Sequence, residues 1–340
     1  MTIENIAKKL NINKSTVSRA LRGHSGVHPD TRERCIRLAG ELGYPIPKDA
    51  DTHNVALILP AKSVDEVHEL AHRSMIAISN EITRIDWQVS FVVVPMLETS
   101  LLDNQKTWPA GLLRANIDSC IVEGMISLES RRMLASHFAN HIVMLSRHYL
   151  QGGLSGVGID NYEGGNFAAE KALAADHPRI GWIGSLGSQD ISRERYYGVC
   201  NCLAKNGMKL SAEIWLDERA PLDMDMIDSV IAPNFSDNPE HRPTVWISST
   251  DWLGAMVMLY FEKRNLFCPD DFSMICFDDT KIAEALVRRE LTSVISPITR
   301  MAVGAVQMLA CGWNGQLDDP AAWLYPFGYR AGKTLNQYKR

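Results

Sequence analysis

Residues 14–21 combine an apolar helical stripe with polar and basic side chains on the opposite face. Lys14, Ser15 and Arg19 lie on that outward face if the segment is helical. An arginine can fork onto a guanine, and a serine hydroxyl can donate to or accept from a base edge. We therefore expect these three residues to read base edges in a DNA major groove.

Further polar residues of the same region fit the DNA backbone better than the bases. Hydroxyl, amide and guanidinium groups bind phosphates and set the register of a protein on the duplex. The expected phosphate contacts are Thr16, Ser18, Arg22 and Asn5. The alternative interpretation is a structural helix pair with a solvated, salt-bridged surface.

Three helices in residues 1–48 are predicted to position these side chains. Apolar residues at 3/4 spacing predict a first helix over 3–10, which a three-residue turn separates from the helix over 14–21. Asn11 can take the left-handed conformation that ends a helix. A third helix is expected to begin at Pro29, because Pro fits the first helical turn. The pattern is that of a helix-turn-helix domain.

The charge of the chain is unevenly distributed. Residues 1–48 carry nine Lys and Arg against four acids, a net charge of +5, whereas the remaining chain carries 26 against 36, a net charge of −10. A small basic domain that meets phosphates and a larger acidic body that does not would have this asymmetry. A solvated basic helix pair remains the simpler alternative on charge alone.

Cysteine usage and hydropathy indicate the compartment. The seven Cys are scattered, and neither a C-x-x-C pair nor a disulfide-like framework is present, so a reducing compartment is expected. The N-terminus lacks an apolar signal core, and the sequence contains no apolar run of 18 residues. We expect a cytoplasmic protein without a membrane segment.

From Val55 the sequence alternates between short apolar runs and helix-length segments. Runs without strict alternation are typical of parallel strands buried on both faces, and helices between them predict a doubly wound α/β body with two lobes. The predicted strands are 55–59, 89–94, 120–122, 141–145, 157–159, 180–183, 245–247 and 274–277. The predicted helices are 65–85, 163–175, 192–206, 252–264 and 298–311.

Motifs for catalysis or cofactor binding are not apparent. Asp278 and Asp279 imitate a carboxylate pair, but adjacent residues of an extended chain point apart. His68 and His72 have i, i+4 spacing without a third metal ligand. Residues 184–188 lack the Lys-Ser/Thr of a phosphate loop. We expect no enzyme, no metal and no cofactor.

The ordered motifs of nearly the whole chain resemble the LacI/GalR family of bacterial transcription regulators. The resemblance is carried by Ile6-Ala7, Asn13 to Leu21, Val27, Thr31-Arg32, Glu41 to Tyr44, Asp160-Asn161, Gly164, His177 to Ile180, Arg195, Gly198, Thr250-Asp251, Phe277 to Asp279 and Leu291 to Val294. It implies a type I periplasmic-binding-protein-like body behind the all-α head. It also implies a homodimer that binds a near-palindromic double-stranded operator and a small molecule between the lobes.

Three residues are the main candidates for binding that small molecule. Arg195 and Asp278 match family positions that hold ligand, and Asp251 follows a predicted strand. Arg and Asp can donate to and accept from adjacent hydroxyls of a sugar. The alternatives are a strand-end turn or helix cap for Asp278-Asp279 and a helix N-cap for Asp251.

Five further residues complete the predicted effector site. Ser146 and Arg147 follow the strand at 141–145, where the family often places a polar contact. Asp160 either lines the cleft or caps the next helix. Trp246 and Trp252 could stack on a sugar ring, with core packing as the alternative for each.

The predicted domains are the head at 1–48, a linker at 49–54 and the body at 55–340. Lobe 1 is placed at about 55–158 and 295–318, and lobe 2 at about 159–293 and 319–340. The segment between Tyr44 and Val55 has two Asp and neither Arg nor Leu, unlike the longer family segment with its hinge helix. Because acids are repelled by a narrow, electronegative minor groove, we expect no hinge-helix wedge.

These observations together predict a sequence-specific DNA-binding regulator controlled by a small polar effector, such as a sugar or a derivative. We expect a repressor of carbohydrate-utilisation genes, although the residues do not separate repressor from activator. A solute-binding protein or a sugar-processing enzyme with a vestigial head is the alternative.

Overall fold

The computed structural model describes residues 2–21, 27–42, 44, 53–59, 69–85, 90–96, 98–113, 117–124, 126–138, 141–146, 153–186, 189–217, 224–232, 238–317 and 319–339. Arg22, Arg147 and residues 49–52 of the predicted linker lie outside these ranges. The question of a hinge helix therefore stays a prediction.

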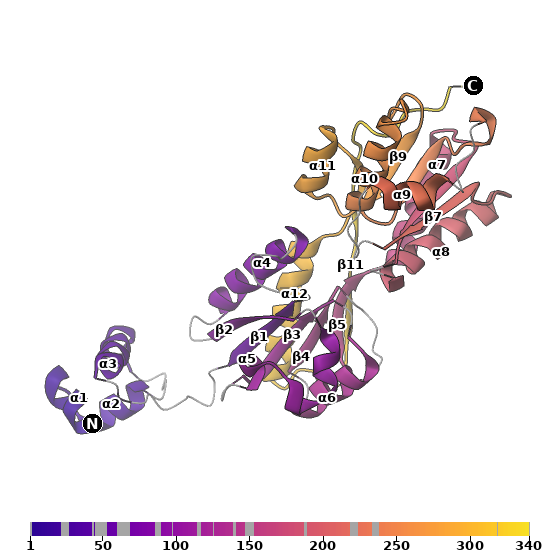
Figure 1. Cartoon of the computed structure of the whole chain (residues 1–340). Coiled ribbons are helices and arrows are strands. Elements are labelled where there is room, and N and C mark those ends of the chain that lie inside the picture. The colour runs from indigo at the N-terminus through magenta and orange to yellow at the C-terminus, as the bar shows by residue number, and fades with distance from the viewer. Residues whose placement is uncertain are drawn as a thin grey trace.

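The head consists of α1 (Ile3–Leu10), α2 (Lys14–Leu21) and α3 (Pro29–Glu41), as the apolar spacing predicts (Figure 1). Asn11 ends α1 in the left-handed conformation with φ 54°. The helices share a small core, with Ile6, Val17 and Cys35 among its buried residues. Burying this apolar face leaves the polar face of α2 free for a partner.

Lobe 1 is built on a six-stranded parallel sheet. Its spatial order is β11 (Ala322–Tyr325), β5 (Ser155–Ile159), β4 (Ile142–Leu145), β3 (Ser119–Glu123), β1 (Asn54–Leu59) and β2 (Ser90–Pro95). The apolar residues of the central strands are buried on both faces, as their uninterrupted apolar runs predict. The helices of this lobe are α4 (Glu69–Ile85), α5 (Ala110–Leu113), α6 (Leu128–Phe138) and α12 (Ile298–Trp313), with 3-10 helices η2 (Thr99–Asp103) and η3 (Gln105–Thr107).

Lobe 2 repeats this architecture with a second six-stranded sheet. Its spatial order is β12 (Gly328–Arg330), β10 (Thr292–Ile295), β9 (Ser273–Phe277), β8 (Val245–Ser248), β6 (Ile180–Ser185) and β7 (Ala212–Leu216). Strand β12 is antiparallel to β10, and the other pairs are parallel. The helices are α7 (Asn161–Ala174), α8 (Gln189–Lys205), α9 (Met224–Ile231), α10 (Asp251–Glu262) and α11 (Lys281–Val287), with a 3-10 helix, η5 (Pro239–His241).

Each sheet is covered on both faces by helices. In lobe 1, α4 and α12 pack on one face and α6 on the other. In lobe 2, α9, α10 and α11 cover one face, and α7 and α8 cover the other. The doubly wound class predicted from the sequence is therefore confirmed, and the carboxyl ends of the parallel strands are available for a binding site.

Over the described residues the chain passes between the lobes three times, and one of these crossings differs from the prediction. Strand β10 lies in the second sheet, so lobe 1 resumes after Ile295, at about the predicted boundary. Strand β11 pairs with β5 in the first sheet, so residues 322–325 belong to lobe 1. The predicted assignment of 319–340 to lobe 2 is wrong for this strand. Its side chains are apolar but half-exposed, and an apolar run by itself does not tell which sheet a strand joins.

Helices α7 and α8 approach each other closely at glycines. A Cβ on Gly165 would overlap the backbone carbonyl of Arg195, and a Cβ on Gly198 would overlap the carbonyl of Tyr162. Only glycine lets the two backbones approach so closely. This crossing sets the position of the Arg195 side chain relative to the start of α7.

We predict that Gly198→Ala destabilises the protein by about 2–4 kcal/mol, because the added methyl group forces α7 and α8 apart. Chemical denaturation followed by circular dichroism measures the change. Gly40→Ala in α3 is the control, since a Cβ there meets nothing within 4 Å. Equal stability of the Gly198 variant and the parent would contradict the prediction.

Candidate functional site

Arg195 of α8 is the centre of a buried polar cluster, with 3% of its surface exposed. Its Nε donates to Oδ1 of Asn161 at 3.0 Å, and Nη1 donates to the carbonyl oxygen of Ser249 at 2.5 Å. Its Nη2 donates to Oδ1 of Asp278 at 3.2 Å and to Oγ of Ser296 at 3.3 Å. The guanidinium is thus held from several directions at once.

The elements of lobe 2 explain why these groups converge. Asn161 begins α7, and Ser249, Asp278 and Ser296 directly follow three neighbouring parallel strands. The carboxyl ends of parallel strands lie at one edge of the sheet, which is where α/β folds bind ligands. The guanidinium also lies over the Phe277 ring, 4.3 Å from its centroid, a favourable cation–π geometry.

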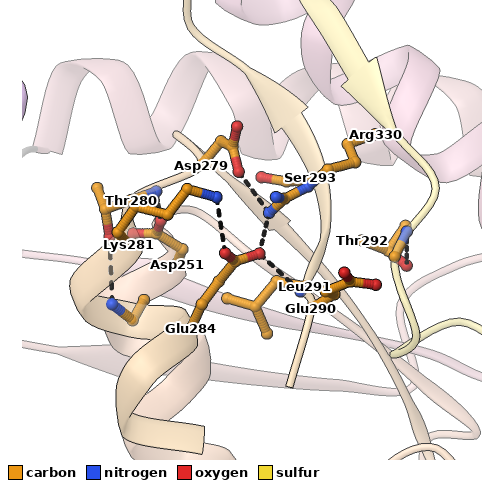
Figure 2. Close-up of polar contacts among 12 residues, drawn as sticks. Asp251, Asp279, Thr280, Lys281, Glu284, Glu290, Leu291, Thr292, Ser293 and Arg330 are labelled. Atoms are coloured by element: carbon orange, nitrogen blue, oxygen red, sulfur yellow. Dashed lines mark hydrogen bonds and ion pairs between the residues drawn. The ribbon is translucent and has the colours of Figure 1, made fainter. Parts of the chain in front are cut away.

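Asp278 and Asp279 form an unusual turn at the end of β9. Both residues have positive φ angles, 92° and 68°. The Asp278 N–H donates to the carbonyl of Val294 at 3.0 Å, and its Oδ1 accepts from Oγ of Ser296 at 3.1 Å. Figure 2 shows Asp279 paired with Arg330 of β12. The turn therefore directs two adjacent carboxylates to different partners.

Asp251 is the first residue of α10 and is 2% exposed. Its Oδ2 accepts the backbone N–H of Thr280 (Figure 2). Burial, together with the negative charge of Asp278, raises the pKa of Asp251 to about 7. The site thus pairs a buried guanidinium with Asp278, and the charge of Asp278 in turn acts on the carboxyl group of Asp251.

The structure places the principal predicted residues, Arg195, Asp251 and Asp278, in one cluster, here called the effector cluster. Neither acid is a helix cap, since Thr250 caps α10 and Thr280 caps α11. The helix-cap alternatives weighed for these acids are therefore wrong, whereas the strand-end turn weighed for Asp278-Asp279 is observed.

The other predicted effector residues are placed less centrally. Asp160 caps α7 by accepting the Glu163 N–H at 2.9 Å. Trp246 is 1% exposed and packs in the lobe 2 core near Phe261, so core packing is its observed role. Trp252 is 40% exposed on α10. Ser146 follows β4 with φ 65° and is half-buried.

Several polar residues of the site were not predicted from the sequence. Asn161, Ser249 and Ser296 join the Arg195 network. The available signal was the place of Ser249 and Ser296 directly after β8 and β10, and of Asn161 at the start of the helix that follows β5. In lobe 1, Glu123 ends β3 and is buried, and its Oε2 accepts from Oγ of Ser74 at 2.6 Å. Glu123 is therefore a polar group at the carboxyl edge of the lobe 1 sheet, the edge at which α/β folds bind ligands.

The predicted DNA-reading residues lie on one open face of the head. Lys14, Ser15 and Arg19 are exposed on α2, and we call them the recognition face. Asn5 is exposed on α1, whereas Thr16 and Ser18 are half-buried. The Lys14 ammonium lies 2.6 Å from Glu4, and this contact lowers the pKa of the Glu4 carboxyl. Because both side chains are exposed, a phosphate or base could replace Glu4 at little cost.

Within the described residues, no three His, Cys, Asp or Glu side chains lie close enough to share a metal ion. None of the helices among those residues is long and apolar enough to cross a membrane.

Comparison with known proteins identifies both parts of the chain. Residues 2–46 match the family model described as bacterial regulatory proteins, lacI family, and residues 169–327 match the periplasmic binding protein-like domain. The head is thus similar to the lacI family of bacterial regulatory proteins, and the body is similar to the periplasmic binding protein-like domain. The family resemblance seen in the sequence motifs is confirmed.

Relatives extend the match over nearly the whole length. The HTH-type transcriptional regulator GalS of Salmonella typhimurium is 25% identical over 344 residues, which is 96% of this chain and 94% of GalS. A lac repressor dimer bound to operator and the anti-inducer ONPF has a TM-score of 0.75 at 18% identity, covering 99% of each chain. A complex of the transcriptional regulator CelR with cellobiose has a TM-score of 0.69 at 19% identity, covering 98% of this chain and 99% of CelR. The fold is lac repressor-like.

We predict that the contribution of Asp251 to the stability of the protein falls as pH rises from about 4 to 8. Its pKa of about 7 lies above the ordinary value of 3.8, so the folded state binds more protons than the unfolded state in this window. Asp251→Asn keeps the acceptor for Thr280 and the neighbours Arg195 and Asp278, but removes the proton. The free energy of unfolding of the variant, measured relative to that of the parent, should be about 1–3 kcal/mol higher at pH 8 than at pH 5.

Urea unfolding at both pH values measures this difference. Asp225→Asn, at an exposed position of α9, is the control and should leave the pH dependence unchanged. A parallel pH dependence in the Asp251 variant and the parent would rule out the assignment of this proton.

Proposed function

We propose that this chain is a transcription regulator that binds an operator through its head and a small polar effector at the effector cluster. One observation carries the proposal. The same chain joins an exposed basic recognition face to a buried Arg195–Asp278 pair at the strand ends of lobe 2. The regulators that it resembles support this reading, since the solved relatives include a repressor on its operator and a regulator with a sugar.

In this proposal the recognition face contacts bases in the major groove. Lys14, Ser15 and Arg19 supply the donors, and the buried stripe of α2 fixes the helix so that they point outward. Thr16, Ser18, Asn5 and Arg22 contact phosphates and set the register. The acidic body then stays away from the duplex, because its net negative charge is repelled by the negative charge of the phosphates.

We predict that the double variant Lys14→Ala/Arg19→Ala loses operator binding. Removal of both cations takes away base contacts worth about 1–3 kcal/mol each. The summed loss of binding energy corresponds to a fall in operator affinity on the order of 100-fold or more. Fluorescence anisotropy on palindromic sites from the DNA upstream of its own gene measures the change. The parent should also lose affinity steeply with salt, by about 0.9 log units per log unit of salt for each phosphate contact.

The control for this experiment is Arg193→Ala/Lys205→Ala, which removes the same charge from exposed positions of α8. It should bind DNA like the parent. Failure of the parent to bind any such site at low salt would contradict the regulator proposal and favour a solute-binding protein.

The proposed effector is a sugar or a sugar derivative. The effector cluster offers a guanidinium with several donors and two carboxyl groups, which together match adjacent hydroxyls. Glu123 and Ser146 would contact it from lobe 1, and Arg147, Asp160 and Trp252 would complete the surround. The gene targets would then be carbohydrate-utilisation genes. We propose that the protein represses these genes in the cytoplasm and performs no catalysis.

We predict that a thermal-shift screen of sugars, sugar acids and polyols finds a ligand that stabilises the parent. The stabilisation should grow with the logarithm of ligand concentration. Arg195→Lys keeps the charge but loses the forked donors, so the shift should disappear in this variant. Arg193→Lys, two residues earlier on the exposed face of α8, should keep it. Equal shifts in both variants would exclude Arg195 from the site.

The proposed assembly is a homodimer. Ile76 of α4 and Ile282 and Leu286 of α11 are large apolar side chains that remain exposed in the single chain. Figure 1 shows α4 and α11 on the same side of the two lobes. A second copy covering this side would bury these residues and connect the heads of two chains for a two-fold operator.

A further inference from the structure

The two lobes contact each other through α4, away from the segments that connect them. Glu69, the first described residue of α4, belongs to lobe 1. Its Oε2 accepts the backbone N–H of Lys281 at 2.7 Å and that of Ile282 at 3.2 Å, both in α11 of lobe 2. Figure 1 shows one end of α4 directed toward α11. We call this pair of hydrogen bonds the interlobe contact.

The interlobe contact satisfies groups that α11 cannot satisfy itself. The first N–H groups of any helix have no partner within the helix. At the start of α11, Oγ1 of Thr280 accepts the Ala283 N–H at 3.4 Å, and Asp251 accepts the Thr280 N–H. The remaining N–H groups, at 281 and 282, are those that Glu69 accepts. A carboxylate there is also favoured by the positive end of the helix.

The same short segment carries the effector carboxylate. Asp278, whose carboxylate pairs with Arg195, lies three residues before Lys281. Within lobe 2, Arg330 of β12 pairs with both Asp279 and Glu284 (Figure 2). Residues 278–282 are therefore held by lobe 2 on one side and by lobe 1 on the other.

A second charge of α4 acts on this turn. Burial raises the pKa of Asp279, and Arg73 is among the cations that oppose this shift, with Arg330 and Lys281. Arg73 lies four residues after Glu69, one helical turn further along the same face. Helix α4 therefore presents a carboxylate to the positive N-terminal end of α11. It also carries a cation, Arg73, whose charge is opposite to that of the Asp279 carboxylate.

We propose that Glu69 is a positioning residue of the effector site, supplied by the first lobe. By accepting from the start of α11, Glu69 holds the turn that presents Asp278 and fixes the relative orientation of the lobes. An effector that moves Asp278 thereby changes the interlobe contact, and the coupling is reciprocal. The inference rests on the proposed effector site. The claim that Glu69 holds the turn and the orientation of the lobes, however, concerns the chain without ligand.

The test compares Glu69→Ala, Glu69→Gln and Glu129→Ala in the full chain without ligand. Glu129 is a matched control, because it is an exposed acid in the first turn of α6 in the same lobe. Amide hydrogen exchange reports on Lys281 and Ile282. Spin labels at the exposed positions Lys106 and Lys209 report the distance between lobes. The labels are attached through an unnatural amino acid, because the chain has seven cysteines, and the labelled chain is diluted with unlabelled protein.

We expect the exchange of both amides to be about tenfold faster in Glu69→Ala, with a broader distribution of interlobe distances. Glu69→Gln keeps a carbonyl acceptor and should be intermediate, and Glu129→Ala should match the parent. Faster exchange with an unchanged distance distribution would overturn the proposal, because Glu69 would then only cap α11. Unchanged exchange would overturn it as well.

If Glu69→Ala fails to fold, Glu69→Gln decides by the same two measurements. Loss of operator binding in the parent would contradict the proposed function, but not the distances measured without ligand. The two failures are therefore distinguishable.

Discussion

The burial of one guanidinium is the constraint on which the arrangement of lobe 2 depends. A charged side chain inside a protein is strongly unfavourable unless hydrogen bonds and an opposite charge compensate it. Arg195 obtains both from groups at the ends of three strands and one helix. The glycines between α7 and α8 are required for the same reason, because they bring the helix that carries Arg195 close to Asn161. Small residues and strained turns in this region are thus consequences of one buried charge.

The parts of the fold that were predicted from the sequence are those with the strongest burial. Central strands such as β1, β3 and β9 are buried along their length, so their apolar runs are unambiguous. Strands β7, β11 and β12 lie at sheet edges with partly exposed side chains, and none of them was among the predicted strands. Helix α11 was missed because it has only seven residues, too few for a clear period.

The candidate site was predictable to a similar extent and for related reasons. Arg195 and Asp278 were predicted because they match family positions that hold ligand, and Asp251 because it follows a predicted strand. The serines and Asn161 that complete the network were not predicted, and their role depends on three-dimensional convergence. Trp246 was offered as a sugar-stacking residue but is buried in the lobe 2 core. Its position within a buried strand determines this packing, whatever its ring could bind. Glu69 could not be found at all, because its partners are main-chain N–H groups more than 200 residues away.

The strand pair β11 and β12 has a consequence for the order of events during synthesis. The two strands are separated by two residues, yet each completes a different sheet. Neither lobe has all of its described strands until residues 322–330 have left the ribosome, whereas the described helices of the head end at Glu41. A nascent chain would therefore carry a folded head while both lobes are still incomplete. Their apolar strands would stay exposed until β11 and β12 pair with them.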